Sequence, residues 1–369
     1  MKILIISDFA APYRIAVFKG LSSTYDVDVF FNIAKSEQRN SKWYAKSDES
    51  FRFFVFGSKE TDDRYKECIK RINEYCAVIC YDPWARRSRA LQRLCIRKRI
   101  PYILNADGAV KINTSFPKKQ IKSFYVKRAA LCFAGCFRAK QYFRAYGAVE
   151  KRIVQHNFSS LFEDQILKSP YSLEQKKRYK EQLGIKAIPT FITVGQFIHR
   201  KGFDLLLKSW KKVEGEAQLY VIGGGPLNDQ YEQFIRENKL SNVYVEDFKI
   251  PAELFKYYQA SDVFLMPTRE DIWGLVVNEA MAVGLPVISS NQCTSANELV
   301  VQGQNGFTYE CENIDELASH INYMIEHQDL WTNFAQKSLE VVQNYTIEGI
   351  VASHLNSLEE LLINRRSCK

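Results

Sequence analysis

Apolar runs typical of buried strands alternate along the chain with amphipathic segments that follow a helical period. In the first half, Lys2–Ser7, Val27–Phe31 and Ala77–Cys80 predict strands, and the basic segment Ala85–Arg99 predicts a helix that Pro101 ends. Strands that alternate with helices are typical of α/β proteins with parallel, doubly wound sheets, so we expect this fold class.

The length of 369 residues favours two domains, each large enough to bury its own core. A polar segment rich in Lys and Gln, residues 166–186, reads as the linker between them. We therefore expect a first domain over residues 1–165, a second domain over residues 187–345 and a final helical segment at 346–369.

The segment from Met266 to Ser289 is the most informative part of the sequence. Val263–Met266 predicts a strand, and Gly274 begins a helical pattern that a later Gly and Pro end. The loop and the helix start therefore lie at the carboxyl end of a strand, where open α/β sheets bind ligands. Free N–H groups at a helix start attract phosphate, whereas Glu279 would repel it but could accept hydrogen bonds from sugar hydroxyls.

This segment resembles the nucleotide-sugar signature of the retaining glycosyltransferases of family 4, which have the GT-B fold. The family pattern is an acidic residue, seven others and a Glu, followed by Ala-Met-Ala-x-Gly-x-Pro-Val. Asp271 and Glu279 occupy the acidic positions here, and the string AMAVGLPVI follows. Asp271 stands where Glu is usual, and Trp273 stands where Phe is usual. Because Glu270 precedes Asp271, it remains open which of these two carboxylates takes the first acidic role. The alternative is an ordinary helix start capped by Asp271, which does not explain the whole string.

The resemblance implies that the second domain binds a nucleotide sugar, linked to UDP or GDP, without a further cofactor or a metal. Lys201 and Arg200 would neutralise the diphosphate, Glu279 would bind the ribose hydroxyls, and Asp271, a predicted catalytic residue, would bind the donor sugar. The N–H groups at the helix start would meet the β-phosphate and sugar hydroxyls. The predicted donor-binding residues are Gln196, Arg200, Lys201, Gly225, Phe248, Ile272, Trp273, Gly274, Leu275, Val276 and Glu279.

Two further loops carry the resemblance. Residues 195–202 are similar to the family's phosphate loop, Gly-Arg-x-x-x-x-Lys-Gly, with Lys201 matching and Gln196 standing where Arg is usual. Gly225 belongs to a Gly-x-Gly-Pro element that the family places near the nucleotide, and Phe248 lies where the family's backbone meets the base.

In the first domain, the resemblance implies a His or acidic residue close to the sugar transfer site, and we predict that Asp107 takes this catalytic role. The alternative is a turn aspartate that precedes a glycine. Pro12, Tyr13 and Arg14 are predicted to contact the acceptor or the donor phosphate; the alternative is a helix start with a surface arginine. In GT-B folds the last helix crosses back to the first domain, which we expect of residues 346–369.

Basic charge is concentrated in the first domain. Residues 1–165 hold 31 Lys+Arg and 16 Asp+Glu, whereas residues 166–369 hold 20 and 26. The predicted helix Ser115–Ala130 interleaves aromatic residues with Lys118, Lys119 and Lys122, a pattern that suits an anionic membrane surface. The alternative is a surface helix whose aromatic side chains pack inward. No nucleic-acid motif accompanies the charge, so we expect no nucleic-acid partner.

No apolar run is long enough to span a bilayer, and the N-terminal sequence MKILIISDF reads as a strand rather than a signal peptide. We therefore expect a cytoplasmic protein that is peripherally associated with the inner face of the plasma membrane.

We expect a GT-B fold with two Rossmann-like domains facing each other across a cleft. The expected function is a retaining, metal-independent glycosyltransferase that transfers a hexose from a nucleotide sugar to a glycan or lipid-linked acceptor in capsule, lipopolysaccharide or other surface polysaccharide synthesis. Two alternatives remain open: a GT-B nucleotide-sugar epimerase without an acceptor, and a non-catalytic nucleotide-sugar-binding scaffold, which Gln196 and Asp271 suggest.

Overall fold

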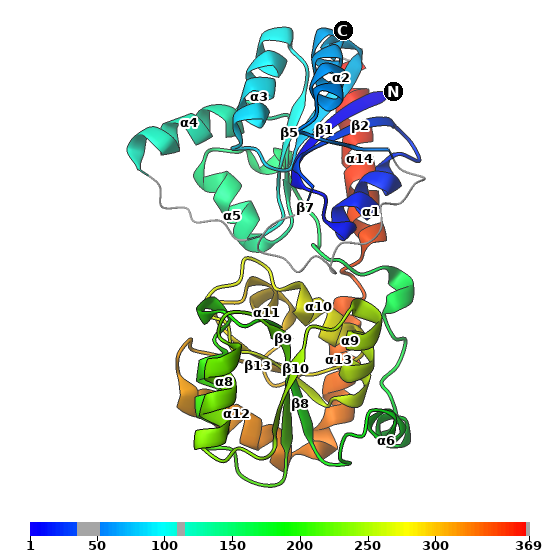
Figure 1. Ribbon diagram of the computed structural model, residues 1–369. Helices are drawn as coiled ribbons and strands as arrows, with labels where there is room; N and C mark the ends of the chain where they lie inside the picture. The colour runs from blue at the N-terminus through cyan, green and yellow to red at the C-terminus, as the bar shows by residue number, and fades with distance from the viewer. Residues whose placement is uncertain (35–51, 109–114, 367–369) are drawn as a thin grey trace. The chain divides into compact units, whose positions relative to one another are not determined.

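The computed structural model describes residues 1–34, 52–108 and 115–366, and the structural statements below concern these residues. They divide into two compact units, one formed by Met1–Ser160 with Thr346–Lys369 and the other by Leu161–Tyr345. Each unit contains one parallel sheet with helices packed on it (Figure 1).

Seven strands form the sheet of the first unit: β1 (Lys2–Phe9), β2 (Asp26–Ile33), β3 (Phe54–Val55), β4 (Tyr75–Cys80), β5 (Tyr102–Ala106), β6 (Leu131–Ala134) and β7 (Ile153–Gln155). Their order in space is β3-β2-β1-β4-β5-β6-β7, with parallel pairing throughout. The chain winds in one direction from β1 and in the other from β4. The topological switch point of this sheet therefore lies between β1 and β4, where the carboxyl ends leave a crevice.

The helices of the first unit are α1 (Pro12–Leu21), α2 (Lys59–Lys70), η2 (Ile72–Glu74), α3 (Arg86–Lys98), α4 (Phe116–Val126), α5 (Phe137–Ala145), η3 (Glu150–Arg152) and α14 (Ile347–Arg366). In Figure 1, α1 and α14 lie together on one side of the sheet, with α3 and α5 on the other. Gly20 permits this close approach of α1 and α14, because a Cβ there would lie 2.5 Å from Cγ2 of Val351.

Six strands form the sheet of the second unit: β8 (Thr190–Gln196), β9 (Gln218–Gly224), β10 (Val243–Asp247), β11 (Val263–Met266), β12 (Val287–Ser290) and β13 (Gly306–Tyr309). Their order is β10-β9-β8-β11-β12-β13, and all pairs are parallel. The switch point of this sheet lies between β8 and β11, so these two strands are expected to position a ligand.

The helices of the second unit are η4 (Glu163–Gln165), α6 (Leu173–Gln182), η5 (His199–Lys201), α7 (Phe203–Trp210), α8 (Asn228–Glu237), α9 (Pro251–Ala260), α10 (Leu275–Ala282), α11 (Thr294–Leu299), α12 (Ile314–Glu326), η6 (Gln328–Leu330) and α13 (Trp331–Val342). In Figure 1, α8 and α12 lie on one side of the sheet and α9 and α13 on the other. Both faces of the sheet are thus covered, as expected for strands that are apolar throughout.

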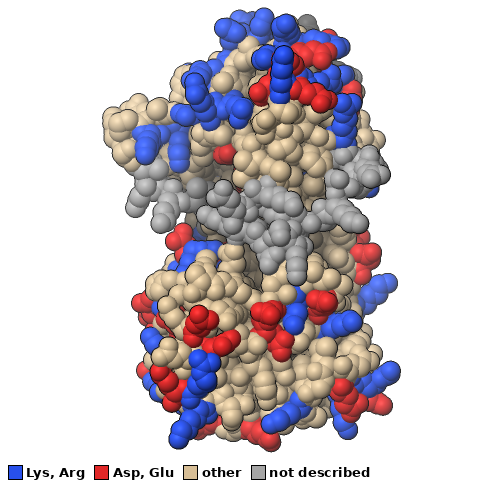
Figure 2. Space-filling model, in the orientation of Figure 1, with Lys and Arg blue, Asp and Glu red and all other residues tan. Residues whose placement is uncertain are grey.

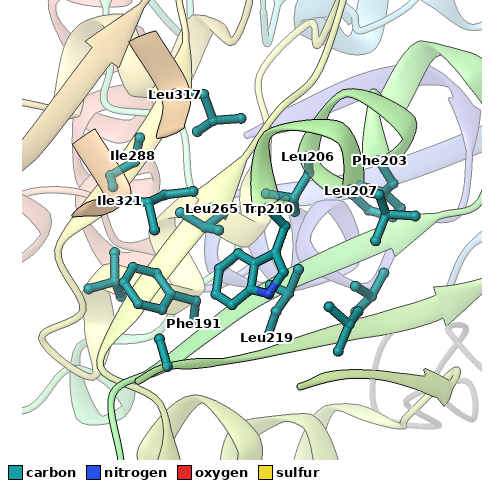
Figure 3. Close-up of a cluster of buried hydrophobic side chains, with 14 of the residues drawn as sticks. Phe191, Phe203, Leu206, Leu207, Trp210, Leu219, Leu265, Ile288, Leu317 and Ile321 are labelled. Carbon is teal, nitrogen blue, oxygen red and sulfur yellow. The ribbon is translucent and has the colours of Figure 1, made fainter. Parts of the chain in front are cut away.

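The core of the second unit forms between the sheet and the helices on one of its faces (Figure 3). Trp210 of α7 is 3% exposed and packs edge-to-face on Phe191 of β8, with 5.6 Å between the ring centroids. Its indole N–H donates to Asn242 Oδ1 at 3.2 Å, so the single polar atom of this side chain is satisfied. The core thereby fixes α7, and with it the loop that precedes this helix.

The predicted α/β class is confirmed, and most element bounds agree within a few residues. The helix predicted over Ser115–Ala130 is shorter, because α4 ends at Val126. The N–H of Ala130 instead donates to the carbonyl of Tyr102 at 2.8 Å, which brings the chain alongside β5 before β6 begins.

Candidate functional site

Two loops meet at the switch point of the second unit: residues 197–202 after β8 and residues 267–274 after β11. The backbone N–H of Arg269 and the hydroxyl of Thr268 both donate to the carbonyl of Arg200, at 2.8 and 2.9 Å. Gly202 has φ +71°, and a Cβ there would lie 2.0 Å from the carbonyl oxygen of Pro267. Only glycine therefore allows the two loops to pack this closely.

An ion pair joins the side chains that these loops carry. Lys201 Nζ lies 2.5 Å from Asp271 Oδ2, and the two side chains are only 12% and 13% exposed. The more exposed Arg200 lies 3.7 Å from the same carboxylate oxygen and donates to the carbonyl of Glu270 at 2.6 Å. Three residues predicted from the sequence, Arg200, Lys201 and Asp271, are thus brought together.

Arg269, which the sequence did not single out, supports this arrangement. Its guanidinium makes two bonds to the carboxylate of Asp204 on α7, at 2.7 and 2.8 Å, and a third to the carbonyl of His199 at 2.8 Å. The hydrogen bond to Asp204, followed by the bond to Glu312, raises the pKa of Arg269 despite partial burial. Arg269 thereby fixes the position of the loop that carries Asp271 relative to the loop that carries Lys201.

Helix α10 begins beside this ion pair. Its N-cap is Gly274, with φ +96°, and a Cβ at this position would lie 2.8 Å from Sγ of Cys293. Asp271 is not the helix cap, because its Oδ1 accepts instead from the N–H of Trp273 at 3.4 Å. No side chain of the described residues caps α10. The predicted anion-binding groups, the N–H groups of Gly274, Leu275 and Val276, therefore lie at a helix start without a side-chain cap.

Glu279 lies on α10 and is half-buried. Its Oε2 accepts a hydrogen bond from the hydroxyl of Tyr258 on α9 at 3.3 Å. Tyr258 is almost fully buried, and burial, together with the charge of Glu279, raises the pKa of its hydroxyl well above the usual value. Tyr258 therefore remains a hydrogen-bond donor that orients the carboxylate.

Trp273, which replaces the usual Phe, is buried. Its indole N–H donates to Asn278 Oδ1 at 2.9 Å, and its ring stacks on Tyr345 with 6.1 Å between the centroids. The substitution therefore adds a hydrogen bond within α10 and its preceding loop. Trp273 acts on the site through packing, whereas its neighbour Ile272 is 58% exposed.

The remaining predicted donor residues lie at the same edge of the sheet. Gln196 is the last residue of β8, Gly225 follows β9, and Phe248 follows β10 and is half-buried. A Cβ on Gly225 would lie 2.8 Å from the carbonyl oxygen of Phe197, which explains the glycine there. Because parallel strands end at one edge, these residues border the crevice that holds Lys201.

The first unit has a second polar cluster, at the carboxyl ends of β1 and β5. Arg14 of α1 is 7% exposed, and its Nη2 lies 2.8 Å from Asp107 Oδ2. It also donates to Ser7 Oγ at 2.9 Å and forms an ion pair with Asp8. The amide of Asn105 donates to the other oxygen of Asp107. The alternative interpretation of Arg14 as a surface arginine is wrong, because two carboxylates hold it inside the unit.

The other residues predicted beside Arg14 are differently engaged. Pro12 is the first residue of α1, a position where its missing N–H costs no helical hydrogen bond. Tyr13 packs edge-to-face on Phe158, with 5.3 Å between the ring centroids. Both side chains are half-buried and lie next to the Arg14 cluster in the chain.

Two buried histidines that were not selected from the sequence lie near this cluster. His354 of α14 stacks on Phe133 at 4.0 Å between centroids and packs edge-to-face on His156 at 4.8 Å. Burial lowers the pKa of His156 to about 4, although the charge of Asp107 acts in the opposite direction. Burial, and then the neighbouring His156, lower the pKa of His354 well below its usual value. Both imidazoles are therefore neutral at pH 7.

Helix α4 presents apolar side chains to solvent. Phe116, Ile121 and Phe124 are 74%, 47% and 43% exposed, so the alternative in which its aromatic side chains all pack inward is wrong. Lys118 and Lys119 are also exposed.

Lys122 of α4 differs from the other two lysines. Its Nζ lies 5.2 Å from the ring centroid of Trp84 and 5.3 Å from those of Tyr142 and Tyr146. Burial, and then the charge of Lys118, lower its pKa. This lysine is thus bound within the unit by cation–π contacts, whereas Lys118 and Lys119 of the same helix are exposed.

Within the described part of the chain, no group of three or more His, Cys, Asp or Glu side chains is arranged to hold a metal ion. No described helix has the length and apolar character needed to cross a membrane.

Two parallel α/β units with polar loops at their switch points are the architecture of the GT-B class, and solved structures of this class match the whole chain. Anabaena Alr3699/HepE in complex with UDP superposes with a TM-score of 0.78 and 16% sequence identity, over 98% of this chain and 100% of that protein. The likeness establishes the GT-B fold.

Residues 175–341, which lie within the second unit, match the family described as Glycosyl transferases group 1. An uncharacterized glycosyltransferase of Haemophilus influenzae is 29% identical over 44% of this chain and 46% of its own length. The amylovoran biosynthesis glycosyltransferase AmsD of Erwinia amylovora is 24% identical over 62% of this chain and 70% of its own length. The chain thus spans about half the length of the Haemophilus relative.

Proposed function

We propose that the protein is a retaining glycosyltransferase that transfers a sugar from a nucleotide diphosphate sugar to a glycan or lipid-linked acceptor in cell-surface polysaccharide synthesis. One observation carries the proposal: the Lys201–Asp271 ion pair at the switch point of the second unit, next to the uncapped start of α10. A cation, free N–H groups and a carboxylate at one crevice suit a ligand with both phosphates and hydroxyls.

In this mechanism the diphosphate displaces Asp271 from Lys201. The ammonium group then neutralises the charge that develops on the leaving diphosphate, and Arg200 adds a second cation. Asp271, released from its partner, accepts hydrogen bonds from the donor sugar. Glu279, oriented by Tyr258, accepts bonds from the ribose hydroxyls.

The first unit would bind the acceptor. Asp107, held by Arg14 and Asn105, lies at the carboxyl edge of its sheet, where an acceptor hydroxyl could bind. We assign Asp107 to the transfer step and Arg14 to the positioning of that carboxylate.

The surface of the first unit supports a membrane-bound acceptor. Figure 2 shows several groups of Lys and Arg side chains on the visible face of this unit, beside smaller acidic groups, whereas basic and acidic side chains are interspersed over the second unit. The exposed apolar side chains of α4, Phe116 and Ile121, lie beside the exposed Lys118 and Lys119. This combination is typical of helices that bind at an anionic membrane surface. The amylovoran function of AmsD also agrees with an acceptor of the cell surface.

The test is the release of nucleoside diphosphate from UDP-, GDP- and ADP-sugars, with and without membrane extract, for the wild type and Glu279→Ala. Release that requires the extract, one donor and Glu279 is the expected result. Conversion of the sugar without release would instead identify an epimerase. Donor binding without either reaction would identify a scaffold.

A further inference from the structure

Three arginines surround a cavity of about 380 Å³ in the first unit. Arg99 ends α3, Arg128 follows α4, and Arg365 lies in the last turn of α14. The other lining residues are apolar or weakly polar: Cys95, Ile96, Ile100, Pro101, Tyr102 and Ala130. A volume of this size is within the range of pockets that bind small ligands.

The cavity holds positive charge that no described carboxylate balances. None of the described residues that line it is Asp or Glu, and none of its three arginines has an ion pair with a described carboxylate. Arg365 Nη2 donates to the carbonyl of Arg99 at 2.8 Å, and Arg128 Nη1 donates to the carbonyl of Phe124 at 3.0 Å. Each guanidinium has five N–H groups, so these single bonds leave donors for a ligand.

The two carbonyl bonds have a structural role, because they satisfy backbone groups near the ends of α3 and α4. That role needs one N–H from each of two arginines. It does not explain why three arginines line one largely apolar cavity, where a bound anion would offset their charges.

The charge of the cavity indicates the class of anion. A phosphodiester carries one negative charge, whereas a phosphomonoester or a diphosphate carries about two or more at neutral pH. Three guanidiniums match the more highly charged groups, and their forked donors fit phosphate oxygens in pairs. The apolar lining suits the hydrocarbon to which such a group is attached.

Arg128, which lines the cavity, also contacts a side chain on the exposed face of α4. The guanidinium of Arg128 lies over the ring of Phe124, 3.9 Å from its centroid, and this ring is 43% exposed. A headgroup bound to Arg128 would therefore lie next to side chains that we have proposed to enter a membrane surface.

We infer that the arginine cavity binds the phosphomonoester or diphosphate headgroup of a membrane lipid. The inference rests on the membrane association proposed above. The cavity lies at the amino end of β5, marked by Tyr102, whereas Asp107 follows the carboxyl end of that strand. Five residues of strand separate the two by roughly 16 Å, so the lipid would anchor the protein without entering the transfer site.

The test is vesicle binding by the full-length protein. Phosphatidylcholine vesicles receive either phosphatidic acid, a phosphomonoester, or phosphatidylglycerol, a phosphodiester, adjusted to equal surface charge. The wild type is expected to bind the phosphatidic acid vesicles about tenfold more tightly. Arg128→Gln with Arg365→Gln should abolish this preference. The matched control, Arg93→Gln with Arg97→Gln, removes two exposed charges of α3 outside the cavity and should weaken both bindings equally.

The inference would be overturned if the cavity pair and the control pair lost the preference for phosphatidic acid equally, or if the cavity pair kept this preference. If the cavity pair does not fold, Arg128→Lys keeps the charge but removes the fork, and it must still reduce the preference. Equally tight binding of inorganic pyrophosphate without vesicles would assign the cavity to a soluble anion instead. Binding of the nucleotide-sugar donor is measured in parallel, because the predicted donor-binding residues lie in the second unit. A failure of donor binding would count against the transferase proposal alone.

Discussion

Arg14 and Asp107 are 93 residues apart in the chain, yet their side chains form an ion pair of 2.8 Å inside the first unit. The pair joins the carboxyl end of β1 to that of β5. Both residues were selected from the sequence for contact with substrate. The structure adds that the carboxylate has a fixed orientation, because Asn105 binds its other oxygen.

Asp107→Asn should reduce turnover by about 100-fold or more, because an amide cannot replace a carboxylate near the transfer site. Affinity for the nucleoside diphosphate should not change, since we propose that the second unit binds it. Steady-state kinetics with a calorimetric measurement of UDP binding separates the two effects. The control is Asp26→Asn, an exposed carboxylate at the other end of the sheet. A variant that loses thermal stability but keeps its kcat would show that Asp107 has only a structural role.

Lys201→Ala should weaken the binding of the nucleoside diphosphate by about tenfold to a hundredfold, the loss of a charge-assisted phosphate contact. Lys208→Ala, an exposed lysine on α7, is the matched control and should bind normally. Titration calorimetry measures both. Because Lys201 is also paired with Asp271, a second comparison with uridine, which has no phosphate, is informative. Equal weakening for uridine and UDP would mean that the substitution disturbs the loop rather than a phosphate contact.

Tyr258→Phe should weaken donor binding about three- to tenfold, because Glu279 loses the hydrogen bond that orients it. The ring remains, so packing of α9 is preserved. Tyr257→Phe on the same helix provides the control. The effect should vanish in a Glu279→Ala background, where the acceptor is absent. An additive double variant would argue against coupling between the two side chains.

The two buried histidines predict a pH dependence of stability. Burial holds the pKa of His156 at about 4, below its unfolded value of 6.5, so between these values the unfolded state binds more protons. The contribution of His156 to the free energy of unfolding is therefore fully present above about pH 6.5. It is lost progressively as the pH falls towards 4. His156→Gln should reduce this slope by up to about 1.4 kcal/mol per pH unit. His199→Gln, an exposed histidine, should leave it unchanged in chemical denaturation across this range.

Lys118→Gln with Lys119→Gln should weaken binding to anionic vesicles by roughly thirtyfold, at about 1 kcal/mol per lysine. Lys122→Gln should instead lower the melting temperature, because its ammonium group lies among three aromatic rings. Lys59→Gln with Lys70→Gln on α2 is the control for charge alone. Vesicle sedimentation and thermal unfolding distinguish the two outcomes. The membrane proposal fails if the α4 pair and the α2 pair behave alike.

The α/β class followed from the sequence because buried parallel strands are apolar and helices between them are periodic. The string around Asp271 and Glu279 located the second-unit crevice, since loop chemistry at a strand end is local in sequence. Tyr258, Arg269 and His354 could not be found in this way. Each contacts a residue of another element: Arg269 donates to Asp204, and Tyr258 donates to Glu279. Their roles exist only after tertiary packing, as does the binding of Lys122 among aromatic rings.

The packing of α14 on α1 has a consequence for biosynthesis. The first unit consists of residues from both sides of the second unit in the chain, and His354 and Val351 of α14 complete its interior. During translation, residues 161–345 can fold as soon as they leave the ribosome, whereas the unit that was begun first must wait for α14. Until then the face of α1 around Gly20 is uncovered. The N-terminal part of the nascent chain, which is synthesised first, should therefore need protection by a chaperone for the longest time.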